Sequence, residues 1–247
     1  MSGHSKWSTI KRKKGAIDAK RSKIFSKIVK EIVVAVKEGG KDPEGNPRLR
    51  LALTNARGTN MPKDNIQRAI SKAEKDSGSF QEITYEGYAP NGIAVVVECL
   101  TDNNNRTVSN IRAIFNRRGG NLGTTGSLNF LFSRKGVITI PKDNLNLDEH
   151  ELDIIDAGAD DIQEEDDFYI ITTSLEGFTK VQRKLDELKV EVENSELRKI
   201  PNETKLLDVE SGKKVMKMVE DFEDDDDVQN VFHNLEITEE LMNAFDE

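Results

Sequence analysis

The order of the elements predicted between residues 135 and 204 limits the fold of this 247-residue chain more narrowly than any other feature. Apolar periodicity and turn residues predict six elements, strand–helix–strand–strand–helix–strand, over residues 137–140, 148–157, 161–164, 168–173, 176–188 and from 190–192 onward. This order is the ferredoxin-like pattern. We therefore predict a complete domain over residues 135–204.

The regions on either side of this domain are each incomplete. Before it, strands are predicted over 83–88, 92–101 and 128–132, with a helix over 108–118; after it, only a helix over 211–222 and a strand over 228–235 are predicted. One helix and one strand bury too little apolar surface to form a domain alone. We therefore predict that residues 79–134 and 205–247 form one discontinuous α+β domain, into which 135–204 is inserted. A C-terminal tail without a partner is the alternative.

The first 78 residues contain only helical patterns, predicted over 16–37, over 47–58 and from 62 onward. In the first helix, one side carries an apolar stripe that includes Phe25 and Ile32. Four lysines lie within an arc of about 80° on the opposite side: Lys20, Lys23, Lys27 and Lys30. The predicted fold class is therefore α+β with three domains. A basic three-helix domain (1–78) precedes two ferredoxin-like α/β sandwiches, one inserted in the other.

The charge of the chain is divided in the same way. Residues 1–75 hold 19 Lys and Arg against 7 Asp and Glu; the whole chain holds 36 and 45, which leaves 17 basic and 38 acidic residues for the remainder. Clustered cations gain affinity for nucleic acid by releasing its condensed counterions. The basic head therefore predicts a nucleic-acid-binding module, with the solvated surface of a small helical domain as the alternative.

Several classes of protein are disfavoured by the sequence. No apolar run of 18 residues predicts a membrane span, and the Lys-rich start has no apolar signal segment. The single cysteine, Cys99, lies in an apolar run, where it is predicted to be a small buried residue of a cytoplasmic protein. The three histidines are dispersed and give neither a catalytic triad nor a metal-ligand spacing. The sequence therefore predicts no enzyme, no metal and no cofactor.

Residues 119–127 are glycine-rich and hold two overlapping G-x-x-G strings. Such loops bring the backbone close to phosphates in KH domains. A helix stop followed by an irregular turn with positive φ is the favoured interpretation. The only basic cluster of the acidic body precedes the loop, and its members are secondary candidates for phosphate contact: Arg106, Arg112, Arg117 and Arg118.

Two acidic runs, 164–167 and 223–227, have no calcium-loop pattern. They are predicted to be solvated turns. Two sharper hypotheses remain open: the runs repel nucleic acid from the body, or they fold back onto the basic head.

The chain resembles the YebC/PmpR family over nearly its whole length. The motifs that carry the resemblance are GHSKW (3–7), KIFSK (23–27), DP (42–43), NPRLR (46–50), NMPKDNI (60–66), RAI (68–70), YEGY (85–88), TDN (101–103), NRT (105–107), GG (119–120) and GS (126–127). The resemblance implies a three-domain α+β protein of the bacterial cytoplasm. It also implies a DNA-binding transcriptional regulator. Some members are instead linked to translation, relieving ribosome stalling on proline-rich nascent chains. Mitochondrial translational activators of cytochrome c oxidase subunit I are related.

The residues themselves and the resemblance together predict a non-enzymatic nucleic-acid-binding regulator, with DNA or ribosomal RNA as partner. A monomer is favoured. The first-rank phosphate-binding candidates lie in the tail and the first helix: Lys6, Lys11, Arg12, Lys13, Lys14, Lys20, Lys23 and Lys27. Neighbouring candidates are Trp7, which stacks on a base or anchors the tail, and Arg21. Second-rank candidates, some of which are alternatively ion-paired with Asp42, Glu44 or Asp64, are Arg48, Arg50, Arg57, Lys63 and Arg68.

In the DNA version, the second and third helices form a helix-turn-helix-like unit whose groove-facing side chains are Lys63, Gln67, Arg68 and Lys72. In the RNA version, the basic tail threads into ribosomal RNA. Two competitors belong to other classes: an enzyme on a ferredoxin-like scaffold, and a protein-interaction module that uses the acidic body.

Overall fold

The computed structural model describes residues 18–75, 80–165 and 167–246. These divide into two compact units. Unit 1 holds the described parts of Gly78–Ser133 and Lys199–Glu247, and unit 2 holds those of Ala19–Ser77 and Arg134–Arg198. The C-terminal segment therefore belongs with the middle of the chain, and residues 134–198 belong with the basic helices.

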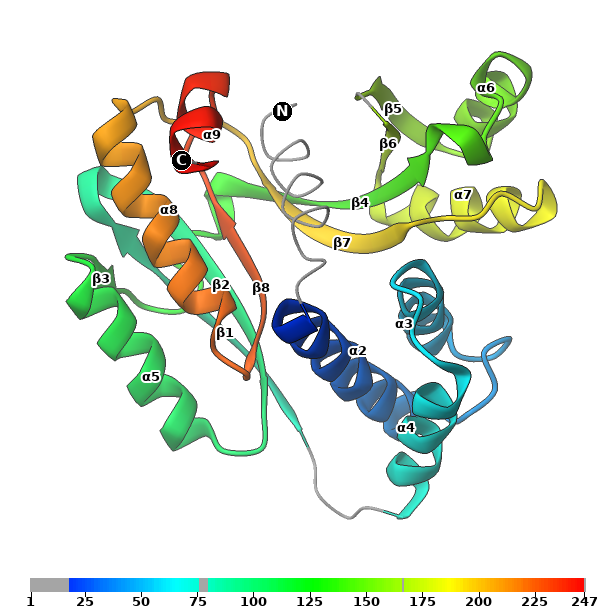
Figure 1. Cartoon of the computed structure of the whole chain (residues 1–247), viewed down its shortest axis with the longest axis horizontal. Helices are drawn as coiled ribbons and strands as arrows, with labels where there is room; N and C mark the ends of the chain where they lie inside the picture. The colour runs from blue at the N-terminus through cyan, green and yellow to red at the C-terminus, as the bar shows by residue number, and fades with distance from the viewer. Residues whose placement is uncertain (1–17, 76–79, 166, 247) are drawn as a thin grey trace. The chain divides into compact units, whose positions relative to one another are not determined.

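Unit 2 begins with three helices, α2 (Asp18–Gly39), α3 (Pro47–Gly58) and α4 (Lys63–Lys75) (Figure 1). Asn46 explains where α3 starts, because its side chain caps the helix by accepting a hydrogen bond from the Leu49 amide at 3.0 Å. The Asn46 amide group also donates to the carbonyl oxygens of Ala35 at 2.6 Å and Gly40 at 2.8 Å. One buried side chain thus fixes the turn between α2 and α3.

The rest of unit 2 has the ferredoxin-like order of elements, and its sheet runs β5-β6-β4-β7. The six elements are β4 (Phe132–Pro141), α6 (Leu147–Asp156), β5 (Ala159–Glu164), β6 (Phe168–Thr173), α7 (Leu175–Glu187) and β7 (Asn194–Pro201). The apolar sides of both helices pack on the sheet around Ile138, Ile171 and Leu185, which are fully buried. The strand–helix order predicted from the sequence is confirmed for this region.

Helix α3 contacts the beginning of β7 within unit 2. The Asn55 side chain accepts a hydrogen bond from the Ser195 amide and donates one to the Ser195 carbonyl oxygen, both at 2.8 Å. At Gly58 the backbones come so close that an added Cβ would lie 2.7 Å from the carbonyl carbon of Glu193, and closer still to its oxygen. Leu51 packs against the apolar core of the sheet. Hydrogen bonding, close backbone approach and apolar contact thus hold α3 on this sheet.

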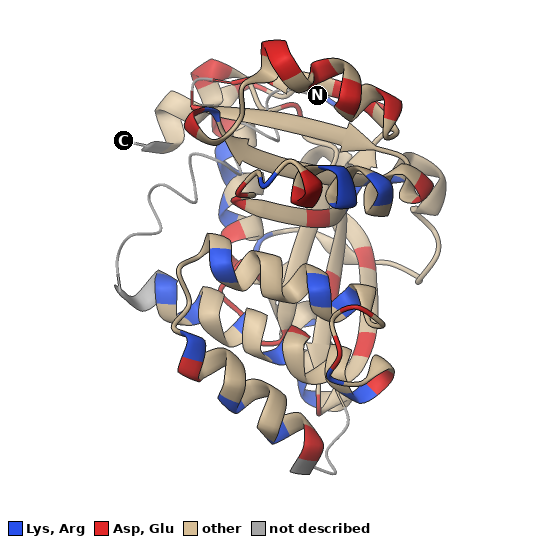
Figure 2. Ribbon diagram, turned by 90° about the vertical axis from the view of Figure 1, so that its right-hand side faces the viewer, with Lys and Arg blue, Asp and Glu red and all other residues tan. Residues whose placement is uncertain are grey.

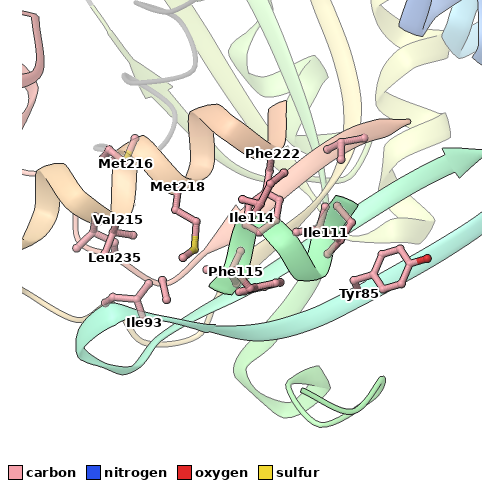
Figure 3. Packing of buried hydrophobic residues seen from close by; sticks show 14 of the residues in the cluster. Tyr85, Ile93, Ile111, Ile114, Phe115, Val215, Met216, Met218, Phe222 and Leu235 are labelled. Atoms are coloured by element: carbon pink, nitrogen blue, oxygen red, sulfur yellow. The ribbon is translucent and has the colours of Figure 1, made fainter. Parts of the chain in front are cut away.

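Unit 1 is built on a second sheet, of order β3-β1-β2-β8. Its elements are β1 (Gln81–Ala89), β2 (Ile93–Thr101), α5 (Asn104–Arg117), β3 (Asn121–Leu122), α8 (Val209–Glu223), β8 (Val228–His233) and α9 (Glu239–Asp246). The C-terminal strand β8 pairs antiparallel with β2, with Val231 opposite Val97. Phe115 of α5 and Phe222 of α8 meet in the core with ring centroids 4.8 Å apart (Figure 3). The C-terminal segment therefore supplies both a strand and a core helix to the middle of the chain.

Several predicted elements differ from the structure, including β4, which starts at Phe132 rather than at 137. Residues 128–132 are not a strand: Asn129–Leu131 form a 3-10 turn, because the Leu128 amide is held by the buried Glu86 carboxylate at 2.6 Å. The strand predicted from 190 starts only at Asn194. Helix α5 starts four residues before the predicted 108, because Asn103 caps it through the Arg106 amide. Helix α9 was not predicted at all.

The predicted fold class is confirmed, since the chain has a helical N-terminal domain and two further α/β domains. The limits 1–78, 79–134 with 205–247, and 135–204 stay a prediction. We propose them as the three domains, because β8 and α8 complete the sheet and core of the middle region.

Candidate nucleic-acid interface

The tail candidates cannot be placed in the fold. Lys6, Trp7, Lys11, Arg12, Lys13 and Lys14 lie outside the described residues. Lys20 lies in the first turn of α2, but its side chain is outside the described part of the structure. The described part of the interface therefore starts at Arg21.

Helix α2 carries the next three candidates. Arg21 is exposed and its guanidinium carbon lies 5.5 Å from the centre of the Phe25 ring, a cation–π distance. Lys23 and Lys27 are half-buried, so their aliphatic stems are partly covered by neighbouring residues. Of the described residues of this helix, Arg21 presents the most accessible cation of the three.

Two arginines of α3 hold the helical domain together. Arg48 pairs with Glu31 at 3.0 Å and with Glu38 at 2.8 Å, which joins α3 to α2. Arg50 donates to the carbonyl oxygens of Pro43 at 3.1 Å and Glu44 at 2.9 Å, and it lies 3.6 Å from the Glu44 carboxylate. These guanidinium groups already meet carboxylate or carbonyl oxygens. A phosphate would have to compete with those partners.

The basic residues at the end of α3 and on the outer side of α4 differ from Arg48 and Arg50 in how they are paired. Arg57, Lys63 and Lys72 are exposed and form no ion pair with any residue in the described ranges. Arg68 is also exposed and donates to the Asp64 carbonyl oxygen at 3.2 Å and to Asn65 Oδ1 at 3.0 Å. The opposite side of α4 is buried through Ala69 and Ala73. Figure 2 shows the basic residues, in blue, spread along the helices of this domain.

Arg106, by contrast, is about half exposed and pairs with a buried carboxylate in unit 1. Its Nη2 lies 2.7 Å from Oδ2 of Asp227, which is 3% exposed, and 2.9 Å from Oδ1 of the exposed Asp102. Asp227 also accepts hydrogen bonds from the buried hydroxyls of Thr101 and Thr107. The bonds to Asp227, and then to Asp102, raise the pKa of Arg106 above its ordinary value. The predicted solvated turn over 223–227 is therefore wrong for Asp227, which is a core residue.

Of the other arginines in α5 and at its C-terminal cap, Arg117 and Arg118 form ion pairs, whereas Arg112 does not pair with a described residue. Asp221 of α8 accepts hydrogen bonds from Arg118 Nε and Arg117 Nη2, both at 2.7 Å. The bond from Arg118 is the main cause that lowers the pKa of Asp221 and raises that of Arg118. Arg112 is exposed and has no ion-pair partner among the described residues. Three of the four cations in this secondary cluster thus join α5 and its C-terminal cap to α8 or to the turn before β8.

We expect the substitution Asp221→Asn to lower the free energy of unfolding by about 1 kcal/mol at pH 7. The folded-state pKa of Asp221 is below the ordinary value of 3.8, so its charge stabilises the fold above that pH. The difference between variant and parent should shrink as the pH falls below 3.8 through the folded-state pKa. Urea unfolding at a series of pH values tests this expectation. Glu210→Gln is the control, because Glu210 lies on the same helix, is exposed and forms no ion pair with a described residue; its free energy of unfolding at pH 7 should stay within about 0.5 kcal/mol of the parent protein's.

The glycine-rich loop is shaped by unit 1 itself. Gly119 and Gly126 have φ of 76° and 88°, as expected for a helix stop and an irregular turn. The Gly123 amide donates to the Glu86 carbonyl oxygen at 2.7 Å, and the Glu86 carboxylate, 2% exposed, holds the Leu128 amide. Both G-x-x-G strings therefore have a local structural explanation.

Sequence reasoning did not identify the acidic residues that form ion pairs with the arginines of the secondary cluster. Asp221 and Asp227 gave no signal, because one lies inside an amphipathic helix and the other ends an acidic run. Lys72 was placed on the groove-facing side of the third helix but not among the ranked candidates. Its position four residues after Arg68 is a signal that could have ranked it.

Two kinds of feature are absent from the described residues. No helix within them is long and apolar enough to span a membrane. No three His, Cys, Asp or Glu side chains among them gather as metal ligands do.

Comparison with known proteins gives consistent matches over the whole chain. Residues 5–76 match the model of the TACO1/YebC protein N-terminal domain, and residues 80–235 match that of the TACO1/YebC second and third domain. A "Probable transcriptional regulatory protein" of Chlorobaculum parvum is 46% identical over 250 residues and covers 100% of both chains. One of the same name from Rubrobacter xylanophilus is 48% identical over 98% of each chain. The crystal structure of a conserved hypothetical protein from Aquifex aeolicus superposes with a TM-score of 0.83 at 43% identity, covering 92% of this chain and 95% of the other.

Proposed function

The chain belongs to the TACO1/YebC family, and we propose that it regulates gene expression by binding nucleic acid through its N-terminal helical domain. Relatives of near-equal length carry the name of transcriptional regulatory proteins, which supports a regulator. DNA is the first proposed target. Binding rather than catalysis is the proposed activity, with no cofactor.

The observation that carries this proposal is the contrast between paired and unpaired cations. Arg48, Arg50, Arg106, Arg117 and Arg118 all contact oxygen atoms of the protein. Arg57, Lys63 and Lys72, at the end of α3 and on the outside of α4, contact no carboxylate among the described residues. An exposed cation without an internal partner can neutralise a phosphate and release its counterion, which is the main source of non-specific affinity. We therefore assign the phosphate-binding surface to the end of α3, α4 and the basic residues that precede them.

The same surface is poor in groups that read bases. Of its side chains, Arg57, Gln67 and Arg68 suit bidentate contact with a base edge, and Arg68 already bonds to Asp64 and Asn65. Phosphate contacts position a protein without selecting a sequence. This favours a second candidate function, in which the surface binds ribosomal RNA by shape and the protein acts in translation. Both targets lie in the cytoplasm, which we propose as its compartment, with a monomer as the binding unit.

We expect the triple variant Arg57→Gln, Lys63→Gln, Lys72→Gln to bind nucleic acid at least about tenfold more weakly near 0.15 M salt, because up to three phosphates are no longer neutralised. The slope of log K against log salt concentration should fall by about 0.9 for each phosphate of duplex DNA that the variant leaves without a cation. Fluorescence anisotropy with a labelled 30-base-pair duplex and a labelled ribosomal RNA fragment measures both quantities.

A matched variant removes three exposed cations elsewhere: Arg183→Gln, Lys214→Gln and Lys217→Gln. Its affinity should stay within about twofold of the parent protein, because local contacts rather than total charge decide binding. Equal weakening in both triple variants would mean that the overall charge of the protein, and not this surface, determines its affinity for nucleic acid. Unchanged affinity in the first variant would refute the surface.

Crosslinking in cells separates the two targets. Lysate is fractionated on a sucrose gradient, and the DNA and RNA crosslinked to the protein are sequenced. Discrete DNA sites, with the protein absent from ribosomal fractions, support transcriptional regulation. Ribosomal RNA recovered from ribosomal fractions supports the translation function and refutes DNA as the target.

A further inference from the structure

Helix α6 of unit 2 exposes large apolar side chains. Leu152 is 76% exposed and Ile155 is 45% exposed, and Leu175 at the start of α7 is 48% exposed. The backbones of the two helices meet where α6 ends: a Cβ added to Gly177 would lie 3.3 Å from the carbonyl carbon of Gly158. Ile155, three residues before Gly158, and Leu175, two before Gly177, therefore lie near this junction.

The exposed residues are not part of the apolar side on which α6 packs. Ile154 is fully buried and Leu147 packs against the same core. At about 100° per residue, Leu152 lies about 160° around the helix from Ile154, and Ile155 about 100° from it. The fold of unit 2 therefore does not require apolar residues at 152 and 155.

Carboxylates surround these apolar side chains. Asp148 and Asp156 lie four residues before and after Leu152, and Glu151 lies four residues before Ile155. Residues four apart are neighbours on a helix surface. All three carboxylates are exposed, and none forms an ion pair with a residue in the described ranges. In Figure 2, α6 is the helix with clustered red at the top of the view.

The helix dipole favours Asp148, which lies in the first turn, but the rest of this arrangement of charge works against the helix. Asp148 and Glu151, and likewise Asp153 and Asp156, are like charges three residues apart, where they repel. Asp156 lies in the last turn, where the helix dipole disfavours a negative charge, and no basic residue lies in that turn. A cationic partner would relieve both effects. An apolar surface ringed by such carboxylates is complementary to a helix with one apolar and one basic side.

We propose that this surface, formed by Asp148, Glu151, Leu152, Ile155, Asp156 and Leu175, docks a basic amphipathic helix of a partner protein. Apolar side chains of the partner cover Leu152, Ile155 and Leu175, and its Lys or Arg residues face the three carboxylates. Nucleic acid is repelled by the same charges. A second copy is a poorer fit, because no large hydrophobic side chain of the described parts of α2, α3 and α4, the basic helices, is exposed. The docking surface is independent of the proposed nucleic-acid interface.

The first test uses a fluorescein-labelled 18-residue helical peptide of Leu, Ala and Lys, with its leucines on one side and its lysines on the other. The full-length protein should bind it with a dissociation constant in the micromolar range. Both Leu152→Ser with Ile155→Ser and the triple variant Asp148→Asn, Glu151→Gln, Asp156→Asn should weaken binding at least tenfold. Circular dichroism should show unchanged folding, because all five side chains are exposed.

Two control variants remove equivalent groups elsewhere. Leu206→Ser removes an exposed leucine, and the triple variant Glu191→Gln, Glu203→Gln, Glu210→Gln removes three exposed carboxylates. Both control variants should bind the labelled peptide with an affinity within about twofold of the parent protein's. Equal weakening by the two charge variants, or no effect of the Leu152 and Ile155 changes, would overturn the proposal.

The second test replaces Leu152 by the photo-crosslinker p-benzoylphenylalanine in cells, with position 206 as control. Mass spectrometry identifies the crosslinked segment. A basic amphipathic helix of another protein, seen at 152 and not at 206, supports the proposal. A second copy of this chain, nucleic acid, or the same products at both positions would overturn it.

Discussion

Replacing Asp227 with alanine is expected to lower the free energy of unfolding by about 2 kcal/mol, because it removes a buried carboxylate that accepts several hydrogen bonds, one of them from a cation. The Asp227 side chain is 5% exposed, and its carboxylate accepts hydrogen bonds from the Arg106 guanidinium and from the hydroxyls of Thr101 and Thr107. Its own carbonyl oxygen accepts from the Leu100 amide at 2.7 Å. Loss of the side chain removes the carboxylate acceptor of the buried Thr101 hydroxyl, whereas the Thr107 hydroxyl can still donate to the Asn103 carbonyl oxygen at 3.0 Å.

The matched control is Asp102→Ala, because Asp102 pairs with the same arginine but its side chain is 63% exposed. Surface pairs contribute about 0.5 kcal/mol, so this variant should differ little from the parent protein. Urea unfolding followed by far-UV circular dichroism measures both. Equal costs for the two variants would show that the burial of Asp227 has no energetic role.

Gly58→Ala is expected to destabilise unit 2 by at least about 2 kcal/mol, although alanine favours a helix by about 1 kcal/mol over glycine. The reason is the backbone of Glu193, whose carbonyl carbon would lie 2.7 Å from the new Cβ. A backbone group cannot rotate away as a side chain does. Helix α3 therefore has to move away from β7, and this movement breaks the Asn55–Ser195 hydrogen bonds at 2.8 Å.

Amide hydrogen exchange at Ser195 locates the effect, because this amide is protected by Asn55. The exchange rate of the Ser195 amide should be higher in Gly58→Ala than in the parent protein. It should be unchanged in Gly45→Ala, where an added Cβ has no neighbour closer than 3.8 Å. A stabilised Gly58→Ala protein with unchanged exchange would mean that helix propensity, not contact with Glu193, dominates at this position.

Most of the fold could be predicted from local patterns. The ferredoxin-like order follows from six clear elements, and the return of the C-terminal segment follows from its being too small to fold alone. One failure depended on a contact between distant residues, and another on a local cap that apolar spacing does not reveal. The turn at 129–131 depends on Glu86, which lies 42 residues from Leu128. The start of α5 depended on recognising Asn103 as its cap rather than on apolar spacing.

The candidate interface was predictable only as a region. Composition places the positive charge in the first 75 residues, yet it cannot tell an arginine that binds phosphate from one that binds a glutamate. Arg48 and Arg57 look alike in sequence, and only the positions of Glu31 and Glu38 separate them. Because ion pairs form between residues brought together by the fold, ranking the cations required the structure.

The pairing of β8 with β2 has a consequence for the protein while it is being synthesised. Residues 19–198 hold everything that unit 2 contains in the described structure, so this unit can close before the last strand leaves the ribosome. The Val95–Glu98 edge of strand β2 stays unpaired until residues 228–233 have left the ribosome, because these residues form its partner strand β8. An apolar strand with a bare edge invites pairing with other chains. The nascent chain is therefore most exposed to aggregation late in translation, when unit 2 can already be folded and unit 1 still lacks its last strand.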